Sequence, residues 1–224
     1  TKTPEFKWGP LSAKQLQVLT WWRKGSAFED YNGIIADGAI RSGKTVSMGF
    51  SFAEWAMESF DGYNFAICGK TIESLRRNVI KTLIRQLRAR GYEVREKRAE
   101  NMMIISRGGR TNDFYLFGGK DESSQDLIQG ITLAGVLLDE AALMPRSFAE
   151  QACARCSEAG SKLWFNCNPE GPEHWLYKEW ILKAGQKNLL CLHFTMDDNP
   201  ALTERIRKRY ENLYTVVFYR RFIQ

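Results

Sequence analysis

The eight residues Gly38-Ala39-Ile40-Arg41-Ser42-Gly43-Lys44-Thr45 decide the fold, because they follow the pattern GxxxxGK[ST]. An apolar segment (33–37) lies directly before them, and a long amphipathic segment (44–60) follows directly. In such a strand-to-helix turn the glycines let backbone N–H groups surround phosphate oxygens, Lys44 reaches the β and γ phosphates, and Thr45 binds Mg²⁺. The alternative is a glycine-rich turn without a ligand, but chance rarely places this pattern between a strand and a helix.

The rest of the chain alternates between short apolar segments and longer amphipathic ones, which predicts an α/β fold with a mainly parallel sheet flanked by helices. We expect strands at 33–37, 64–68, 133–139, 162–166 and 189–194, and helices at 44–60, 72–90, 147–158, 172–183 and 200–214. Between residues 92 and 118 the short runs NMMIIS and NDFYLFG flank SRGGRT. This pattern predicts a β-hairpin inserted beside the main sheet.

A second motif is an apolar strand, GVLL, that ends in Asp139 and Glu140. In open α/β sheets ligands bind at the carboxyl ends of strands, so Asp139 can bind Mg²⁺ and Glu140 can activate the water that attacks the γ phosphate. The alternative is a strand that ends in two solvated acids. About a hundred residues separate the two motifs, so another strand can lie between them. With no NKxD segment or lid in the sequence, this favours a P-loop NTPase of the RecA-like (ASCE) type.

Composition and charge fit a single folded domain over residues 1–224, with about 200–224 as the start of a linker. No apolar run reaches the roughly 18 residues of a membrane span, and no signal peptide pattern begins the chain. The five cysteines predict reduced, buried thiols, and Cys153 and Cys156 form a CxxC pair without further zinc ligands.

The positive charge of the chain is concentrated in one region. The net charge of the chain is +6, yet residues 70–110 alone hold twelve Lys or Arg against four Glu, a net charge of +8. The remainder is therefore about −2.

Part of this positive charge recurs at helical spacing and predicts a DNA-binding stripe of Arg77, Lys81, Arg85 and Arg88 on one face. A solvated basic helix face explains the same spacing. Asp197 and Asp198 precede Asn199-Pro200, so we expect them to cap the last helix rather than to bind a metal.

The order of several segments resembles the large terminase subunit of tailed bacteriophages, closest to the PBSX-like branch, over nearly the whole chain. Besides GAIRSGKT, the resemblance is carried by AICGKTIESLRRNVI (66–80), LIQGITLAGVLLDEAALMP (127–145), WFNCNPEGPEHWLYKEWI (164–181) and FTMDDNPAL (194–202). It implies the ATPase domain of that subunit, with ATP and Mg²⁺ as cofactors. Complete members also carry a nuclease domain, and this chain ends where that domain would begin, so we expect no nuclease activity in it.

The resemblance also implies roles for single residues. Lys44 and Thr45 match the phosphate and metal ligands, and Asp139 and Glu140 the metal ligand and the catalytic carboxylate. Arg41 lies where similar terminases carry an arginine that acts on the γ phosphate of its own subunit, although an exposed loop arginine explains it too. The following two assignments also have a simpler explanation. Asn168 lies in a segment like the family's coupling motif and is the expected nucleotide sensor. Alternatively, it belongs to a simple Asn-Pro turn. Gln15, in preference to Gln17, resembles the glutamine that contacts adenine, but a helix start capped by Ser12 explains the same segment.

As a function, the resemblance implies an ATP-hydrolysing motor that moves double-stranded viral DNA into a procapsid in the host cytoplasm, with no membrane involved. The implied partners are the DNA, the portal protein, the small terminase subunit and further copies of the chain in a ring. Arg107 and Arg110 of the hairpin are candidates for an arginine supplied to a neighbouring copy. Two alternatives remain: a nucleotide-gated docking module, and a helicase-like DNA remodeller.

Overall fold

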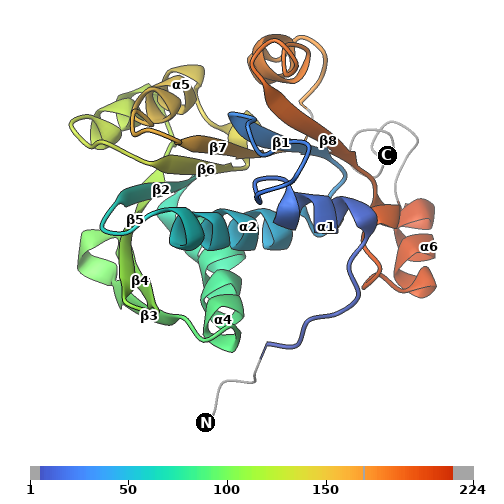
Figure 1. Ribbon diagram of the computed structural model, residues 1–224. Helices are drawn as coiled ribbons and strands as arrows, with labels where there is room; N and C mark the ends of the chain where they lie inside the picture. The colour runs from blue at the N-terminus through green and yellow to red at the C-terminus, as the bar shows by residue number, and fades with distance from the viewer. Residues whose placement is uncertain (1–5, 169, 214–224) are drawn as a thin grey trace.

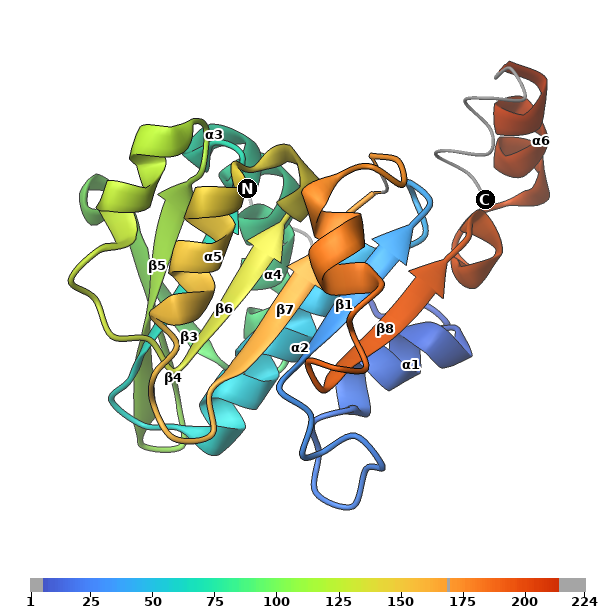
Figure 2. The same ribbon diagram turned by 90° about the horizontal axis from the view of Figure 1, so that it is seen from above.

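The computed structural model describes residues 6–168 and 170–213, and its centre is an eight-stranded sheet with helices on both faces (Figures 1 and 2). The strand order is β3-β4-β5-β2-β6-β7-β1-β8. The strands span Gly33–Gly38 (β1), Asn64–Gly69 (β2), Glu93–Lys97 (β3), Met102–Arg107 (β4), Arg110–Gly118 (β5), Gly135–Asp139 (β6), Lys162–Asn166 (β7) and Leu189–Phe194 (β8). Each pair of neighbours in the series β5-β2-β6-β7-β1-β8 is parallel, which confirms the predicted mainly parallel α/β sheet.

The central strands are buried on both sides, as a parallel sheet covered by helices requires. All six residues of β1 and all five of β6 are buried. The helices α1 (Ala13–Thr20), α2 (Lys44–Ser59) and α4 (Lys81–Ala89) lie on one face, and α5 (Arg146–Ala154) lies on the other (Figure 2). Each face therefore has its own hydrophobic cluster.

The predicted hairpin forms, but it is part of the main sheet rather than an insertion beside it. Strand β5 pairs in parallel with β2, and β4 pairs antiparallel with β5. Strand β3, which was not predicted, pairs antiparallel with β4 and forms the edge of the sheet. The alternation of apolar and polar residues in the hairpin predicts its two strands. It does not indicate which other strands of the sheet these two pair with.

The helix predicted at 72–90 is present but irregular. It begins at the capping box of Thr71 and Ser74, runs through α3 (Ile72–Leu75), and passes through a π-helical turn, η1 (Arg76–Ile80), before α4. In this turn the N–H of Lys81 donates to the carbonyl of Arg76, which adds one residue to the turn. Such turns are rare and occur frequently at functional sites.

Three predicted helices are shorter than expected. The helix predicted at 147–158 is α5, which ends at Ala154. Instead of a helix at 172–183, turns flank the short helical stretch 175–181, which contains the π-helical turn η5 (Tyr177–Ile181). Instead of starting at 200, α6 spans Glu204–Leu213, and the hydroxyl of Thr203 accepts from the N–H of Ile206 at 3.4 Å. Proline occupies the first position of the last two predicted helices, where it fits a helix start and a turn equally well.

The expected role of Asp197 and Asp198 as caps of α6 is wrong. Asp198 accepts from the backbone N–H of Thr195 at 2.8 Å and closes the 3₁₀ turn η6 (Met196–Asp198). It also forms an ion pair with Lys14, at 2.9 Å, and Asp197 forms one with Arg207 inside α6. The two acids therefore connect the end of β8 to α1 and α6.

The five cysteines are all free thiols, of which Cys68 and Cys167 are buried, Cys153 and Cys156 are half-buried, and Cys191 is exposed. Cys191 corrects the expectation of burial, because β8 is an edge strand with one side open to solvent. No helix in the described part of the chain is long and apolar enough to cross a membrane.

The cluster on the α2 face is built on aromatic contacts around Trp164, whose side chain is fully buried. Its ring centroid lies 4.8 Å from that of Trp55 and 5.0 Å from that of Trp21, and its indole N–H donates to the hydroxyl of Ser51 at 3.3 Å. These contacts fix α1 and α2 against β7.

We predict that Trp164→Ala lowers the free energy of unfolding by about 3–5 kcal/mol, because it leaves a cavity in this cluster. Urea denaturation followed by circular dichroism measures the change. Leu182→Ala, at a side chain that is 63% exposed, is the matched control and should change the stability by less than about 0.5 kcal/mol. Similar effects of both changes would contradict the importance of this cluster.

Candidate nucleotide-binding site

The motif residues 38–45 form a tight loop from β1 to α2, and its shape depends on two glycines. Gly38 and Gly43 have φ angles of +113° and +84°, in the region that other residues rarely adopt. A Cβ atom at Gly38 would lie 2.1 Å from the carbonyl oxygen of Phe194. Glycine is therefore required where the loop passes over the end of β8.

Lys44 begins α2, and its side chain folds back inside the loop. The ammonium donates to the carbonyl of Gly38 at 3.0 Å and to that of Ala39 at 2.5 Å, and to Oδ1 of Asn168 at 3.2 Å. Burial lowers the pKa of Lys44 to about 8, while nearby acids oppose the shift. A buried cation surrounded by neutral acceptors is suited to receive an anion.

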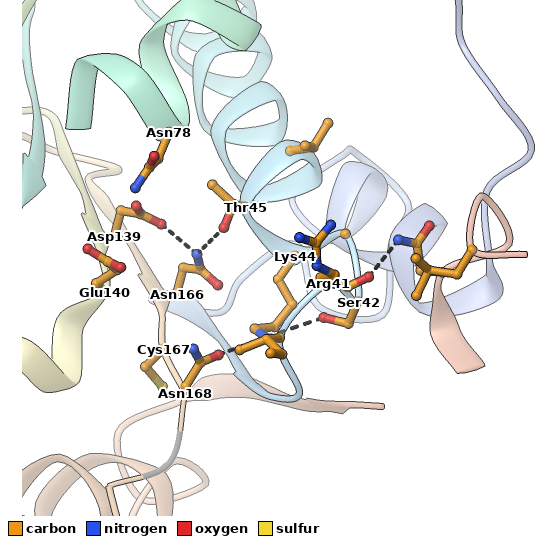
Figure 3. Close-up of a pocket in the computed structure, with 15 residues that line it drawn as sticks. Arg41, Ser42, Lys44, Thr45, Asn78, Asp139, Glu140, Asn166, Cys167 and Asn168 are labelled. Carbon is orange, nitrogen blue, oxygen red and sulfur yellow. Dashed lines mark hydrogen bonds between the residues drawn. The ribbon is translucent and has the colours of Figure 1, made fainter. Parts of the chain in front are cut away.

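Asp139, Asn166 and Thr45 meet where β6, β7 and α2 come together (Figure 3). The side-chain amide of Asn166 donates to Oδ1 of Asp139 at 2.5 Å and to the hydroxyl of Thr45 at 2.9 Å. Its own Oδ1 is buried and has no hydrogen-bond partner among the described residues. Burial raises the pKa of Asp139 to about 6, although the hydrogen bond from Asn166 lowers it. An acceptor without a donor beside two oxygen ligands fits a site for a hydrated cation.

Glu140 and Arg41 both have left-handed backbone conformations, with φ of 56° and 58°. Glu140 follows the last residue of β6 and lines the same pocket as Lys44 and Asp139. The guanidinium of Arg41 lies 5.5 Å from the ring centroid of Tyr210 in α6, and its carbonyl accepts from Nδ2 of Asn199 at 2.6 Å. The loop is thereby connected to the segment after β8.

One open pocket contains most of the predicted nucleotide-site residues, but Gly38 and Ala39, at the start of the loop, do not line it. The residues that line it are Ile40, Arg41, Ser42, Gly43, Lys44, Thr45, Val46, Asn78, Asp139, Glu140, Asn166, Cys167, Asn168, Asn199 and Leu202. Three of these asparagines were not predicted as site residues. Asn166 is in the quoted coupling segment and Asn199 in an Asn-Pro pair, whereas Asn78 has no motif around it.

Gln15 does not line this pocket and instead supports the loop from behind. It is buried, its Oε1 accepts from the N–H of Ser12 at 3.0 Å, and its Nε2 donates to the carbonyl of Ser42 at 3.2 Å. The alternative interpretation, that this segment starts a helix capped by Ser12, is confirmed, because Ser12 and Gln15 form a capping box at α1. The contact of Gln15 with adenine stays a prediction. To make it, the side chain of Gln15 would have to give up its hydrogen bond with Ser12 or with Ser42.

The predicted DNA stripe lies on η1 and α4, and its first residue, Arg77, adjoins Asn78, which lines the same pocket as the loop. Arg77 and Lys81 are exposed, whereas Arg85 is half-buried. Arg88 is exposed and donates from Nη2 to the carbonyl of Val94 at 3.1 Å. Arg77 and Lys81 are therefore the two members most open to a phosphate backbone.

The hairpin arginines lie far from the pocket of their own chain, at the turn between β4 and β5. Arg110 is the first residue of β5. It therefore lies at the amino ends of the parallel strands, on the opposite side of the sheet from their carboxyl ends. Its guanidinium donates to the carbonyl of Met57 at 3.2 Å, and that of Arg107 donates to the carbonyl of Arg90 at 3.3 Å. Their action on a neighbouring copy stays a prediction.

The site and topology together define a class of protein. The phosphate loop follows β1, the acidic pair ends β6, and β7 lies between these two strands in the sheet. This is the arrangement of a P-loop NTPase of the ASCE type. No group of three or more His, Cys, Asp or Glu side chains that could bind a metal occurs within residues 6–168 and 170–213.

The chain belongs to the large terminase subunit family, because residues 35–222 match the family model described as terminase large subunit, T4likevirus-type, N-terminal. The PBSX-like branch stays a prediction. Among solved structures, the large terminase of a thermophilic bacteriophage matches with 60% identity and a TM-score of 0.93 over 96% of this chain and 53% of that chain. The complex of the same terminase with ADP matches with 59% identity and a TM-score of 0.92, over 96% of this chain and 52% of that chain.

A more distant match shares the fold alone. The large terminase ATPase domain of Thermus phage P74-26 is 19% identical, with a TM-score of 0.66 over 97% of this chain and 93% of that domain. The chain spans about half the length of the terminase chains from the thermophilic bacteriophage that it matches. No curated protein matches it.

We predict that Gln15→Ala weakens the binding of ATP and of GTP by the same factor, because the loop loses the support of the amide at Ser42. Titration calorimetry with both nucleotides measures the two affinities. Gln17→Ala, on the same helix and outside the contacts of the loop, is the control and should leave them unchanged. A selective loss of ATP affinity would instead establish Gln15 as the residue that reads adenine.

Proposed function

We propose that this chain is the ATP-hydrolysing motor domain of a viral large terminase, which couples hydrolysis to the translocation of double-stranded DNA into a procapsid. The observation that carries the proposal is the meeting of Lys44, Asp139 and Glu140 in one pocket at the carboxyl ends of β1 and β6. The complexes of the similar terminase from the thermophilic bacteriophage with ADP and with ATP-γ-S support the binding of an adenine nucleotide.

In this proposal each side chain has a distinct task in hydrolysis. Lys44 leaves the carbonyls of Gly38 and Ala39 to bind the β and γ phosphates, and Arg41 approaches the γ phosphate from the loop. Glu140 accepts a proton from the attacking water while the water oxygen bonds to the γ phosphorus. The bond from this phosphorus to the β–γ bridging oxygen breaks, and ADP and phosphate are the products.

Thr45 and Asp139 are the residues that would hold Mg²⁺, which supplies charge neutralisation at the phosphates when it is bound. Asn166 orients both ligands through its two hydrogen bonds, and its free Oδ1 is available to a water of the cation. Asn168 contacts Lys44 directly and is therefore positioned to sense a change at the phosphates.

The wider assignments follow from the family. The proposed partners are double-stranded DNA, the portal protein, the small terminase subunit and further copies of the chain in a ring on the procapsid in the host cytoplasm. We propose further that this part of the protein has no nuclease activity. The cationic residues on η1 and α4 are the proposed contacts to DNA phosphates.

We predict that Glu140→Gln keeps the affinity for Mg²⁺-ATP within a few-fold but slows hydrolysis by at least about a hundredfold, because an amide cannot accept the proton of the water. Phosphate release measures turnover, and titration calorimetry measures binding. Lys44→Ala is the companion variant and should lose binding itself. Normal turnover of Glu140→Gln would move the base to another residue, and a wild-type chain that binds ATP without hydrolysing it would favour the docking module.

We predict that Arg77→Glu with Lys81→Glu weakens binding to random duplex DNA and flattens its salt dependence. Each lost phosphate contact lowers the log-log slope by about 0.9, so the slope should fall by up to about 1.8. Fluorescence anisotropy at several salt concentrations measures it. Lys24→Glu with Lys120→Glu makes the same charge change at two exposed sites elsewhere and should change the slope less. Equal slopes in both double variants would exclude the stripe as the DNA contact.

A further inference from the structure

Asn78 lines the pocket from the helix of residues 72–89, which carries no part of the phosphate loop or the acidic pair. Its side chain points toward the carboxylate of Asp139 from the wall opposite to the loop, with Thr45 nearby (Figure 3). Asn78 is exposed and occupies the middle of the π-helical turn η1. The irregular turn therefore presents an amide to the γ-phosphate end of the proposed site.

Two glycines bring this helix close to the sheet, and the helix also packs against α2. A Cβ atom at Gly69 would lie 2.9 Å from Cβ of Leu75, and one at Gly118 would lie 3.2 Å from the backbone nitrogen of Ile72. On α2, a Cβ atom at Gly49 would lie 3.5 Å from Cγ1 of Val79, the neighbour of Asn78. Gly49 is one helical turn beyond Thr45, so this contact brings Asn78 next to the start of α2.

The first side chain of the turn fixes it from the other side. Arg76 forms an ion pair with Glu96 of β3 at 3.2 Å and donates to Oδ1 of Asn101, just before β4, at 3.1 Å, which attaches the turn to this edge of the sheet. Arg76 is anchored outward and Val79 packs against α2, so the backbone at Asn78 is held in place before any ligand arrives. A fixed backbone reduces the conformational entropy that Asn78 loses when its side chain makes a contact.

We propose that Asn78 contacts the γ phosphate of ATP by donating from its side-chain amide, and that the helix of residues 72–89 thereby distinguishes ATP from ADP. The proposal rests on the nucleotide-binding function proposed above. Exposed cationic side chains, Arg77 and Lys81, flank Asn78 in the same helix. Loss of the γ phosphate therefore acts on the element that carries the proposed DNA contacts.

The test compares the affinities of variants for Mg²⁺-ADP and Mg²⁺-ATP-γ-S by titration calorimetry. Asn78→Ala should bind ATP-γ-S about tenfold or more weakly, because a hydrogen bond to a charged group is lost, and should bind ADP within about twofold of wild type. Asn78→Asp keeps the size of the side chain but places a carboxylate against the γ phosphate, so it should weaken ATP-γ-S binding at least as much. Glu73→Ala, an exposed position on the same helix outside the pocket, is the control and should change neither affinity.

Three outcomes would overturn the proposal, and they differ in meaning. Equal weakening of ADP and ATP-γ-S in Asn78→Ala would assign Asn78 a structural role in the pocket. Unchanged affinity for both would exclude any contact with the nucleotide. A wild-type chain that binds neither nucleotide, while its circular dichroism spectrum is that of a folded protein, would overturn the proposed function itself.

Discussion

The hydrogen-bond register of the three strands β6, β7 and β1 is the constraint on which the site depends. Asn166 ends β7 and pairs with Asp139 on one side and with Ala36 on the other. Because successive side chains of a strand point to opposite faces, a slip of one residue would turn Asn166 away from both motifs. With this register, one amide contacts the last residue of β6 and the second residue of α2 at the same time. The two nucleotide motifs, about a hundred residues apart in sequence, are joined by a strand that belongs to neither.

Burial at this junction affects the two charged residues in opposite directions. It lowers the pKa of Lys44 and raises that of Asp139, since water solvates neither charge well there. Backbone carbonyls and asparagine amides compensate in part. Phosphates beside Lys44 and a cation beside Asp139 would supply the charge that each residue lacks. The same dry surroundings that cost stability in the free protein make each of these contacts stronger when a ligand is bound.

The sequence predicted what periodicity and motif spacing encode. Strands 162–166 and 189–194 were predicted with the bounds observed, and the phosphate loop lies between a strand and a helix as its pattern indicated. The turn at Asn78 and the sheet position of the hairpin were not predicted, because both depend on contacts between distant segments. Gly69 and Gly118, which let the helix of residues 72–89 approach, resemble any other glycine until the structure shows what they face. Part of the predicted linker, beyond residue 213, and Pro169 lie outside the described residues.

A crystal structure of the chain with Mg²⁺ and a non-hydrolysable ATP analogue tests the proposed site most directly. We expect the β and γ phosphates to lie in the loop of residues 38–45, and the ammonium of Lys44 to leave the carbonyls of Gly38 and Ala39 to contact them. The cation should lie between Thr45 and Asp139. An analogue bound elsewhere on the chain, or phosphates in the loop while Lys44 keeps its present contacts, would contradict the proposed site.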